Sequence, residues 1–235
     1  ATVCFNTELL GYSAAWSDGF LEFDPSRYGL TGSTKPKGRI LFANGITPGW
    51  AHNGKLDNPR PRQLGSLPRN WARYRGLYRH GNRVVLNYTV GETGVLETPW
   101  AGQADGRLFL TRTLEFDQAA KPLTGLIAIK QGATAVLQKI GGLAVAQLPA
   151  GDETLWVAAL GQGTGLAVKN DRILLTVQPG EAKRLARVFI VQAPLGHAES
   201  VVALAKANAV IEPPSRLANG GPGLWPSLAT RGVVG

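Results

Sequence analysis

Residues 67–100 read LPRNWARYRGLYRHGNRVVLNYTVGETGVLETPW, and this stretch decides the fold class. Its segment 83–90 has the alternation and the β-branched and aromatic residues of a strand. The residues His80-Gly81-Asn82 before it predict a hairpin turn, and Gly91 and Gly94 after it predict a tight return. Strands joined by such short turns are typical of antiparallel sheets. The stretch therefore favours an all-β fold.

Strand signals recur at short intervals along the rest of the chain, separated by turns that contain many of its 30 glycines and 15 prolines. Only residues 198–209 have helical composition. The pattern predicts a large two-sheet antiparallel β-sandwich, supersandwich-like, with one short helix near the C-terminus. A β-propeller is the alternative fold, although no repeat of about 40 residues is present. Strands are expected at residues 2–5, 12–16, 19–23, 39–43, 76–78, 83–90, 107–116, 123–130, 133–139, 143–148, 154–160, 166–169, 173–177 and 184–192.

The chain divides into a β-sandwich domain at residues 1–212 and a Pro/Gly-rich C-terminal linker or extension at residues 213–235. Trp156 and Phe189 lie in strands that are apolar on both sides, so we expect them between the sheets. Residues 44–68 form a loop long enough to be functional or to cover a sheet edge. No apolar run approaches the ~20 residues of a membrane span, so no transmembrane segment is expected.

The chain contains no methionine, even at position 1, which we expect of a chain that begins after processing or of a piece of a longer protein. Cys4 is the only cysteine, so no internal disulfide is possible. It lies between Val3 and Phe5 in an alternating apolar segment. We therefore expect a buried and unreactive thiol.

The net charge of +9 favours an acidic partner. Basic residues are spread along most of the chain, and the one dense run, residues 60–83, is interleaved with aromatic residues and prolines. No zinc-finger spacing, basic helix or RNA-binding aromatic signature accompanies it, so no nucleic-acid partner is expected. A docking surface for an acidic protein partner, or for the rest of a larger chain, explains the charge at least as well.

The arginines and aromatic residues within residues 67–83 are the candidate partner-binding residues. Arginine and large aromatic side chains give much contact area, and arginine adds planar hydrogen-bonding groups. We expect Trp71 and Tyr74 to anchor the partner. The alternative is a purely structural role, in which the aliphatic parts of the arginine side chains stack on the aromatic rings and the charged groups stay in solvent. The predicted binding set is Arg69, Trp71, Arg73, Tyr74, Arg75 and Arg79.

No compact catalytic set is visible in the sequence. A nucleophile elbow and a Walker loop are absent, and the glycine-rich residues 161–165 read as a turn between strands. His52, His80 and His197 lack ligand spacing, so no metal site is predicted, although a three-histidine site assembled in space stays open. Without a Cys-x-x-Cys-His motif the chain cannot attach a c-type haem, and we expect no cofactor in it.

A carbohydrate-binding or carbohydrate-active β-sandwich is the alternative function. Such a site needs aromatic platforms for sugar rings, and hydrolysis also needs two facing carboxylates. The possible stacking residues are Trp16, Trp50, Trp71 and Tyr74, and the candidate acids are Asp18, Glu22, Glu92 and Glu97. A sugar site would be a concave groove with an exposed aromatic residue, whereas a docking face would be broad and rich in arginine.

Two stretches resemble a known family. Residues 3–23, VCFNTELLGYSAAWSDGFLEF, and residues 67–97, LPRNWARYRGLYRHGNRVVLNYTVGETGVLE, are similar to an uncharacterised N-terminal β domain of large bacterial proteins. Residues 219–226, NGGPGLWP, look like the junction that follows this domain. In those proteins a sorbosone-dehydrogenase-like propeller and a c-type cytochrome domain come next. Asp18 stands where the family pattern has a glycine.

The resemblance implies one module of an exported, electron-transferring dehydrogenase-type protein, or a stand-alone descendant that has lost the propeller and the haem. Together with the basic Arg/aromatic face and the lack of a compact catalytic set, it leads us to expect a non-catalytic structural or docking module of an extracytoplasmic, periplasmic oxidoreductase or redox complex linked to haem or quinone. Its partners would be the other domains or subunits of that complex. A haem c or quinone cofactor would then belong to those associated domains and not to this chain. The resemblance carries over no catalytic residue.

Overall fold

The computed structural model describes residues 1–23 and 34–218, and most of these residues lie in antiparallel strands. One sheet has eight strands in the order β11-β12-β13-β16-β9-β8-β7-β6. Its edge strands are therefore β11 and β6. The eight strands are β6 (Ala72–His80), β7 (Arg83–Val90), β8 (Thr93–Ala104), β9 (Arg107–Phe116), β11 (Val136–Ile140), β12 (Leu143–Ala150), β13 (Glu153–Leu160) and β16 (Arg184–Ala193).

Short turns connect most neighbouring strands of this sheet. Between β8 and β9, Asp105 and Gly106 both have positive φ, 50° and 70°. A two-residue turn with two positive φ angles matches the right-handed twist of the paired strands, and Asp-Gly is the sequence that adopts it readily. Local sequence therefore sets the pairing of this hairpin.

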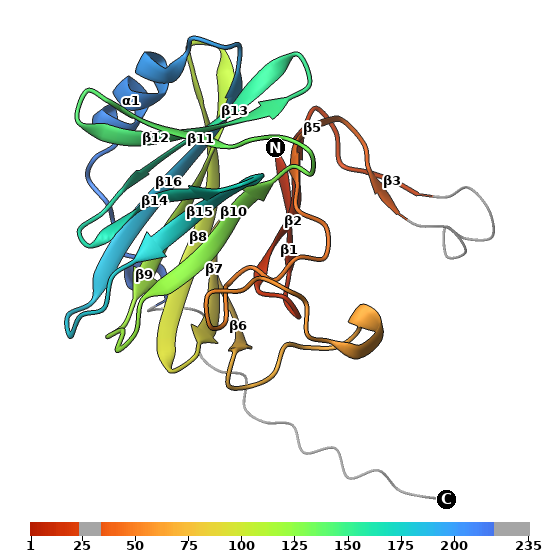
Figure 1. Cartoon of the computed structure of the whole chain (residues 1–235), viewed down its shortest axis with the longest axis vertical. Coiled ribbons are helices and arrows are strands. Elements are labelled where there is room, and N and C mark those ends of the chain that lie inside the picture. The colour runs from red at the N-terminus through yellow and green to blue at the C-terminus, as the bar shows by residue number, and fades with distance from the viewer. Residues whose placement is uncertain (24–33, 219–235) are drawn as a thin grey trace, which may run out of the picture.

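The second layer consists of two three-stranded sheets, β1-β2-β5 and β10-β15-β14, which face the large sheet (Figure 1). Asn44 joins them, because its Nδ2 donates to Ile127 O and its Oδ1 accepts from Ile129 N, both at 3.0 Å. Trp50 adds a backbone bridge to Gly125, where a side chain would collide with the indole ring. The strands are β1 (Thr2–Asn6), β2 (Gly11–Ser17), β5 (Arg39–Ala43), β10 (Leu123–Ile129), β14 (Thr164–Lys169) and β15 (Arg172–Val177).

The main hydrophobic core lies between the two layers and includes Tyr88, Phe116 and Trp50. A second core lies under helix α1 (Ala198–Ala207) and contains Trp156 and Phe189. The prediction that these two residues lie between the sheets is wrong. They point to the other face of the large sheet, where the helix covers them.

Smaller elements complete the described structure. Strands β3 (Leu21–Glu22) and β4 (Lys35–Pro36) pair in an arm that projects from the body (Figure 1). The short helices are η2 (Pro61–Gln63) and α2 (Ser215–Ala218), and α2 packs on β6 and β7. Among the described residues, no helix has the length and apolar character needed to cross a bilayer.

The structure confirms the predicted all-β class, its stacked antiparallel sheets and the helix near residue 198. Besides the position of Trp156 and Phe189, it differs in two places. Residues 93–104 form one long strand, β8, where only a turn was expected. Cys4 is exposed, because its side chain lies on the outer face of the edge strand β1. The predicted C-terminal linker or extension, residues 213–235, includes the short helix α2, and its residues 219–235 lie outside the described residues.

Candidate functional site

The predicted binding arginines lie at one free edge of the large sheet. Arg69 precedes β6, the outermost strand, and Arg73, Arg75 and Arg79 belong to it. All four side chains are exposed. We call these four residues the arginine edge.

The arginine edge presents its side chains on both faces of the strand. Arg73 pairs with Thr89 and Arg79 with Val84, and side chains of paired residues share a face. Val84 packs against the main core, whereas Thr89 follows the core residue Tyr88 and so points to the opposite face. Arg75 is the extra residue of a β-bulge. A partner that touches all of these arginines must therefore lie along the edge.

The arginine edge carries free positive charge. None of its four guanidinium groups forms an ion pair with an acidic side chain of the described residues. Arg79 Nε donates only to the carbonyl of Gly81, at 3.2 Å. Leu77, 56% exposed, lies among them and adds an apolar contact.

The expected aromatic anchors lie deeper than the sequence suggested. Trp71 is buried, its Nε1 donates to Trp50 O at 2.8 Å, and its ring stacks on His52 with centroids 5.1 Å apart. Tyr74 is half-buried and packs against the main core. Trp71 therefore packs in the interior just before the start of β6, and its ring is not accessible to a partner.

The candidate sugar-stacking residues are also enclosed. Trp16 and Trp50 are buried, and Trp16 Nε1 donates to Phe20 O at 2.6 Å. Of the candidate acids, Glu97 has no exposed surface, while Asp18, Glu22 and Glu92 are exposed on separate turns and strands. Three of the four candidate stacking rings, Trp16, Trp50 and Trp71, therefore offer no open face to a sugar, whereas Tyr74 is half-buried.

A buried polar network lies at the centre of the sandwich, and the sequence did not reveal it. Arg112 on β9 donates from Nε to Glu97 Oε1 at 2.6 Å and from Nη2 to Glu97 Oε2 at 3.3 Å. Tyr88 OH donates to Glu97 Oε2 at 2.6 Å. Arg112 Nη1 also donates to Leu126 O at 3.1 Å, and its guanidinium lies 4.7 Å from the ring centre of Tyr12. The network therefore ties the large sheet to both halves of the second layer.

Burial and charge set the ionisation of this network. Desolvation, and then the negative charge of Glu97, raise the pKa of Tyr12 and Tyr88 well above the ordinary tyrosine value. Desolvation alone would lower the pKa of Arg112, but the charge and hydrogen bonds of Glu97, with smaller contributions from Tyr12 and Tyr88, together outweigh it and raise that pKa. The tyrosines thus stay neutral and the arginine stays charged. Tyr12 OH has no hydrogen-bond partner among the described residues. Because the group is almost fully buried and its two charges are paired with each other, it is a structural connection between layers.

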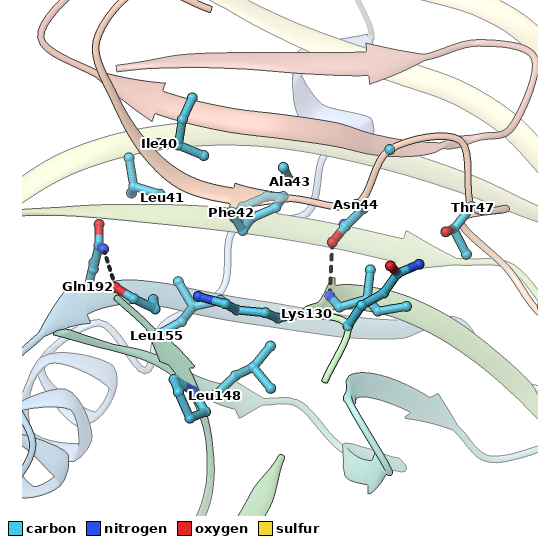
Figure 2. A pocket seen from close by; sticks show the side chains of 15 residues that line it. Ile40, Leu41, Phe42, Ala43, Asn44, Thr47, Lys130, Leu148, Leu155 and Gln192 are labelled. Carbon is cyan, nitrogen blue, oxygen red and sulfur yellow. Dashed lines mark hydrogen bonds between the residues drawn. The ribbon is translucent and has the colours of Figure 1, made fainter. Parts of the chain in front are cut away.

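A cavity of about 520 Å³ lies beside strand β5, between this strand and the large sheet (Figure 2). We call it the β5 cavity. Its apolar lining includes Ile40, Phe42 and Leu155. Its polar lining includes Lys130 and Gln192, which the sequence did not single out. Lys130 follows β10 and Gln192 lies in β16, which are distant in sequence, so no local pattern could have joined them.

The three histidines lie on separate elements. His52 stacks on Trp71, His80 ends β6, and His197 precedes helix α1. In the part of the chain that the structure describes, no three His, Cys, Asp or Glu side chains are grouped as metal ligands.

Residues 3–97 match the family model described as a domain of unknown function (DUF6797). This match confirms the resemblance to an uncharacterised domain over these residues, which include both quoted stretches and the whole arginine edge. The matched segment ends inside β8, so it contains Tyr12, Tyr88 and Glu97 but not Arg112. No curated protein matches the chain significantly.

Proposed function

We propose that this chain is a non-catalytic docking module that binds an acidic protein surface along its arginine edge. The observation that carries the proposal is the row of four exposed arginines beside a sheet edge that no other described strand pairs with, without ion-pair partners among the described residues. Exposed charges of one sign attract an oppositely charged partner and raise its association rate.

The arrangement of β6 also supports an edge-on contact. Arg73 and Arg79 project to opposite faces, and the exposed Leu77 lies between them in sequence. A partner segment that runs beside β6 reaches both faces, as strands added to a sheet edge do. Charged residues and bulges also protect edges from aggregation, and that protective role predicts no specific partner.

Residues 3–23 and 67–97 resemble the N-terminal β domain of large redox proteins, and this resemblance supports a redox protein as the partner. We infer that the module docks to other domains or subunits of a periplasmic oxidoreductase or redox complex that uses haem or quinone. In this proposal the redox cofactor belongs to the partner. This chain fixes the position and orientation of that partner.

Photo-crosslinking in the source cells tests the proposal. A benzoylphenylalanine at position 77 on β6 is compared with one at position 137, where Leu137 is exposed on β11, the opposite edge of the same sheet. We expect position 77 to capture a subunit or domain of a haem- or quinone-linked oxidoreductase, and position 137 not to capture it. The yield should fall several-fold with Arg73→Ala and Arg75→Ala. Equal capture from both edges, or none from position 77, would contradict the proposal.

A further inference from the structure

The outer side of strand β6 presents backbone groups as well as arginine side chains. A two-residue turn joins β6 to β7, so His80 and Arg83 at its ends form a hydrogen-bonded pair. Along an antiparallel ladder, hydrogen-bonded pairs alternate with pairs that exchange no hydrogen bond. Leu77 and Arg79 fall in pairs of the second kind. Their N–H and C=O groups therefore point away from β7, toward the edge of the sheet.

These backbone groups have no hydrogen-bond partner among the described residues. No described strand pairs with β6 on this side, and no described turn or loop donates to these groups or accepts from them. Water satisfies such groups at an exposed edge, and the backbone of an added strand can replace that water. The bulge at Arg75 interrupts the ladder, so the regular part of the edge is residues 76–80. An added strand therefore has a short and defined place to bind.

The side chains beside these groups define what an added strand needs. Leu77 pairs with Leu86 and Arg79 with Val84, and both pairing residues contact the main core, so Leu77 and Arg79 project to the core face. Leu77 is nevertheless 56% exposed. An apolar residue of an added strand would cover it. Tyr78 projects to the opposite face, on the side where helix α2 packs.

A second copy of this chain fits the edge poorly. Its β6 carries the same four arginines, and like charges on neighbouring strands are destabilising. Charged edge residues of this kind prevent edge-to-edge pairing between copies. The same charges attract an acidic segment, because no described acidic side chain forms an ion pair with them. The arginines therefore select the sign of charge that an added strand must carry.

We propose that β6 binds an extended acidic segment of the partner as an added antiparallel strand. An acidic residue of this segment lies beside Arg79, and an apolar residue two positions later lies beside Leu77. The direction follows the large sheet, whose strands from β6 to β9 all pair antiparallel. This inference rests on the proposed docking function and specifies the kind of segment that docks.

Titration of the full chain with the peptide acetyl-Thr-Glu-Val-Leu-Thr-Glu-amide tests the inference. We expect saturable shifts of the Leu77 and Arg79 backbone amides by NMR at millimolar peptide. The peptide leucine bonds to the backbone of Leu77, whereas the backbone of the peptide valine points away from β6. N-methylation of the peptide leucine should weaken binding about tenfold, and N-methylation of the valine should change it little. The two methylated peptides have the same composition, so they differ only in the backbone group that is blocked.

Arg79→Ala should weaken the peptide several-fold, and a peptide with lysine at both glutamate positions should not bind. The matched control is Lys139→Ala on β11, the opposite edge of the sheet, which should leave the affinity unchanged. No saturable shift of the two amides, or equal affinity of the two methylated peptides, would overturn strand addition. Capture of the native partner from position 77 without peptide binding would overturn strand addition alone, whereas peptide binding without capture would contradict the docking function.

Discussion

Arg112 Nε lies 2.6 Å from Glu97 Oε1 at the centre of the sandwich, where both side chains are almost fully removed from solvent. Their strands, β9 and β8, are neighbours, and the two residues project between the layers. Further hydrogen bonds from Tyr88 to Glu97 and from Arg112 to Leu126 complete the group. Both charges belong to the large sheet, so the pair is connected to the second layer through Arg112, whose hydrogen bond to Leu126 O would be lost if that layer were displaced.

Removal of one charge should destabilise the protein strongly. We expect Glu97→Leu to lower the free energy of unfolding by about 3–5 kcal/mol, because Arg112 stays buried without its partner. The double variant Glu97→Leu with Arg112→Met should recover more than half of this loss. Urea unfolding of the two single variants and the double variant measures the coupling. Additive losses would show that the two side chains do not depend on each other.

The raised pKa values of Tyr12 and Tyr88 predict a limit of stability at alkaline pH. Burial, and then the charge of Glu97, keep both phenols neutral in the native state. The unfolded chain binds fewer protons once the pH exceeds about 10, the ordinary tyrosine value. This stabilising contribution is therefore complete below that pH and is lost as the pH rises above it.

Absorbance at the tyrosinate band, recorded together with circular dichroism, checks the alkaline prediction. The two buried tyrosines should ionise only when the secondary structure is lost. Tyr12→Phe and Tyr88→Phe should each reduce the absorbance change of that step. Ionisation of either ring in the folded protein would show that solvent reaches the network.

Glu115 predicts an acid-sensitive attachment of helix α2. Burial alone would raise the pKa of Glu115, but hydrogen bonds from Ser215 and Lys183 outweigh it and lower that pKa. Its contribution is complete above the ordinary glutamate pKa of about 4.3 and is lost as the pH falls through the lowered native value. Hydrogen exchange of residues 212–218 should therefore accelerate at acid pH.

Glu115→Gln is the matched variant for the acid prediction, because it keeps the shape and removes the titration. Exchange of residues 212–218 should already be faster near neutral pH in this variant and should depend less on pH. If wild type and variant show the same acid profile, the attachment does not rest on Glu115.

Trp71 should behave as a core residue. Trp71→Ala removes a buried ring and should lower the free energy of unfolding by about 3–5 kcal/mol. Trp71→Phe keeps much of the apolar volume but loses the hydrogen bond to Trp50 O, so its loss should be smaller. Thermal and urea unfolding compare the two variants. A stability unchanged in Trp71→Ala would instead fit an exposed partner anchor.

Local patterns predicted the fold class but not the long-range pairings. Alternation over Arg83–Val90 and the Gly-rich turns are visible within a few residues, so the antiparallel class followed from them. Strand β8 was missed because Gly94, Pro99 and Gly102 interrupt its pattern, and these residues have weak strand propensity.

The candidate sites depend on contacts between distant strands. Glu97 was grouped with the candidate acids of a sugar site, because its pairing with Arg112 depends on the register of β8 on β9 and is not visible in the local sequence. Trp71 looked like a surface anchor because arginines surround it in sequence, while the backbone of Trp50 that it contacts belongs to another segment. Exposure of the arginines could be predicted, since four guanidinium groups without counter-charges are costly to bury.

The most direct test of the docking proposal is the association rate of the partner captured through position 77, measured against salt concentration. The variant pair Arg73→Ala with Arg75→Ala is compared with Lys139→Ala with Lys169→Ala, which removes the same charge from exposed positions on β11 and β14. Circular dichroism confirms that both are folded. The arginine pair should slow association several-fold at low salt and flatten its salt dependence, whereas the lysine pair should change little. Equal rates for wild type and the arginine pair at every salt concentration would contradict docking through the arginine edge.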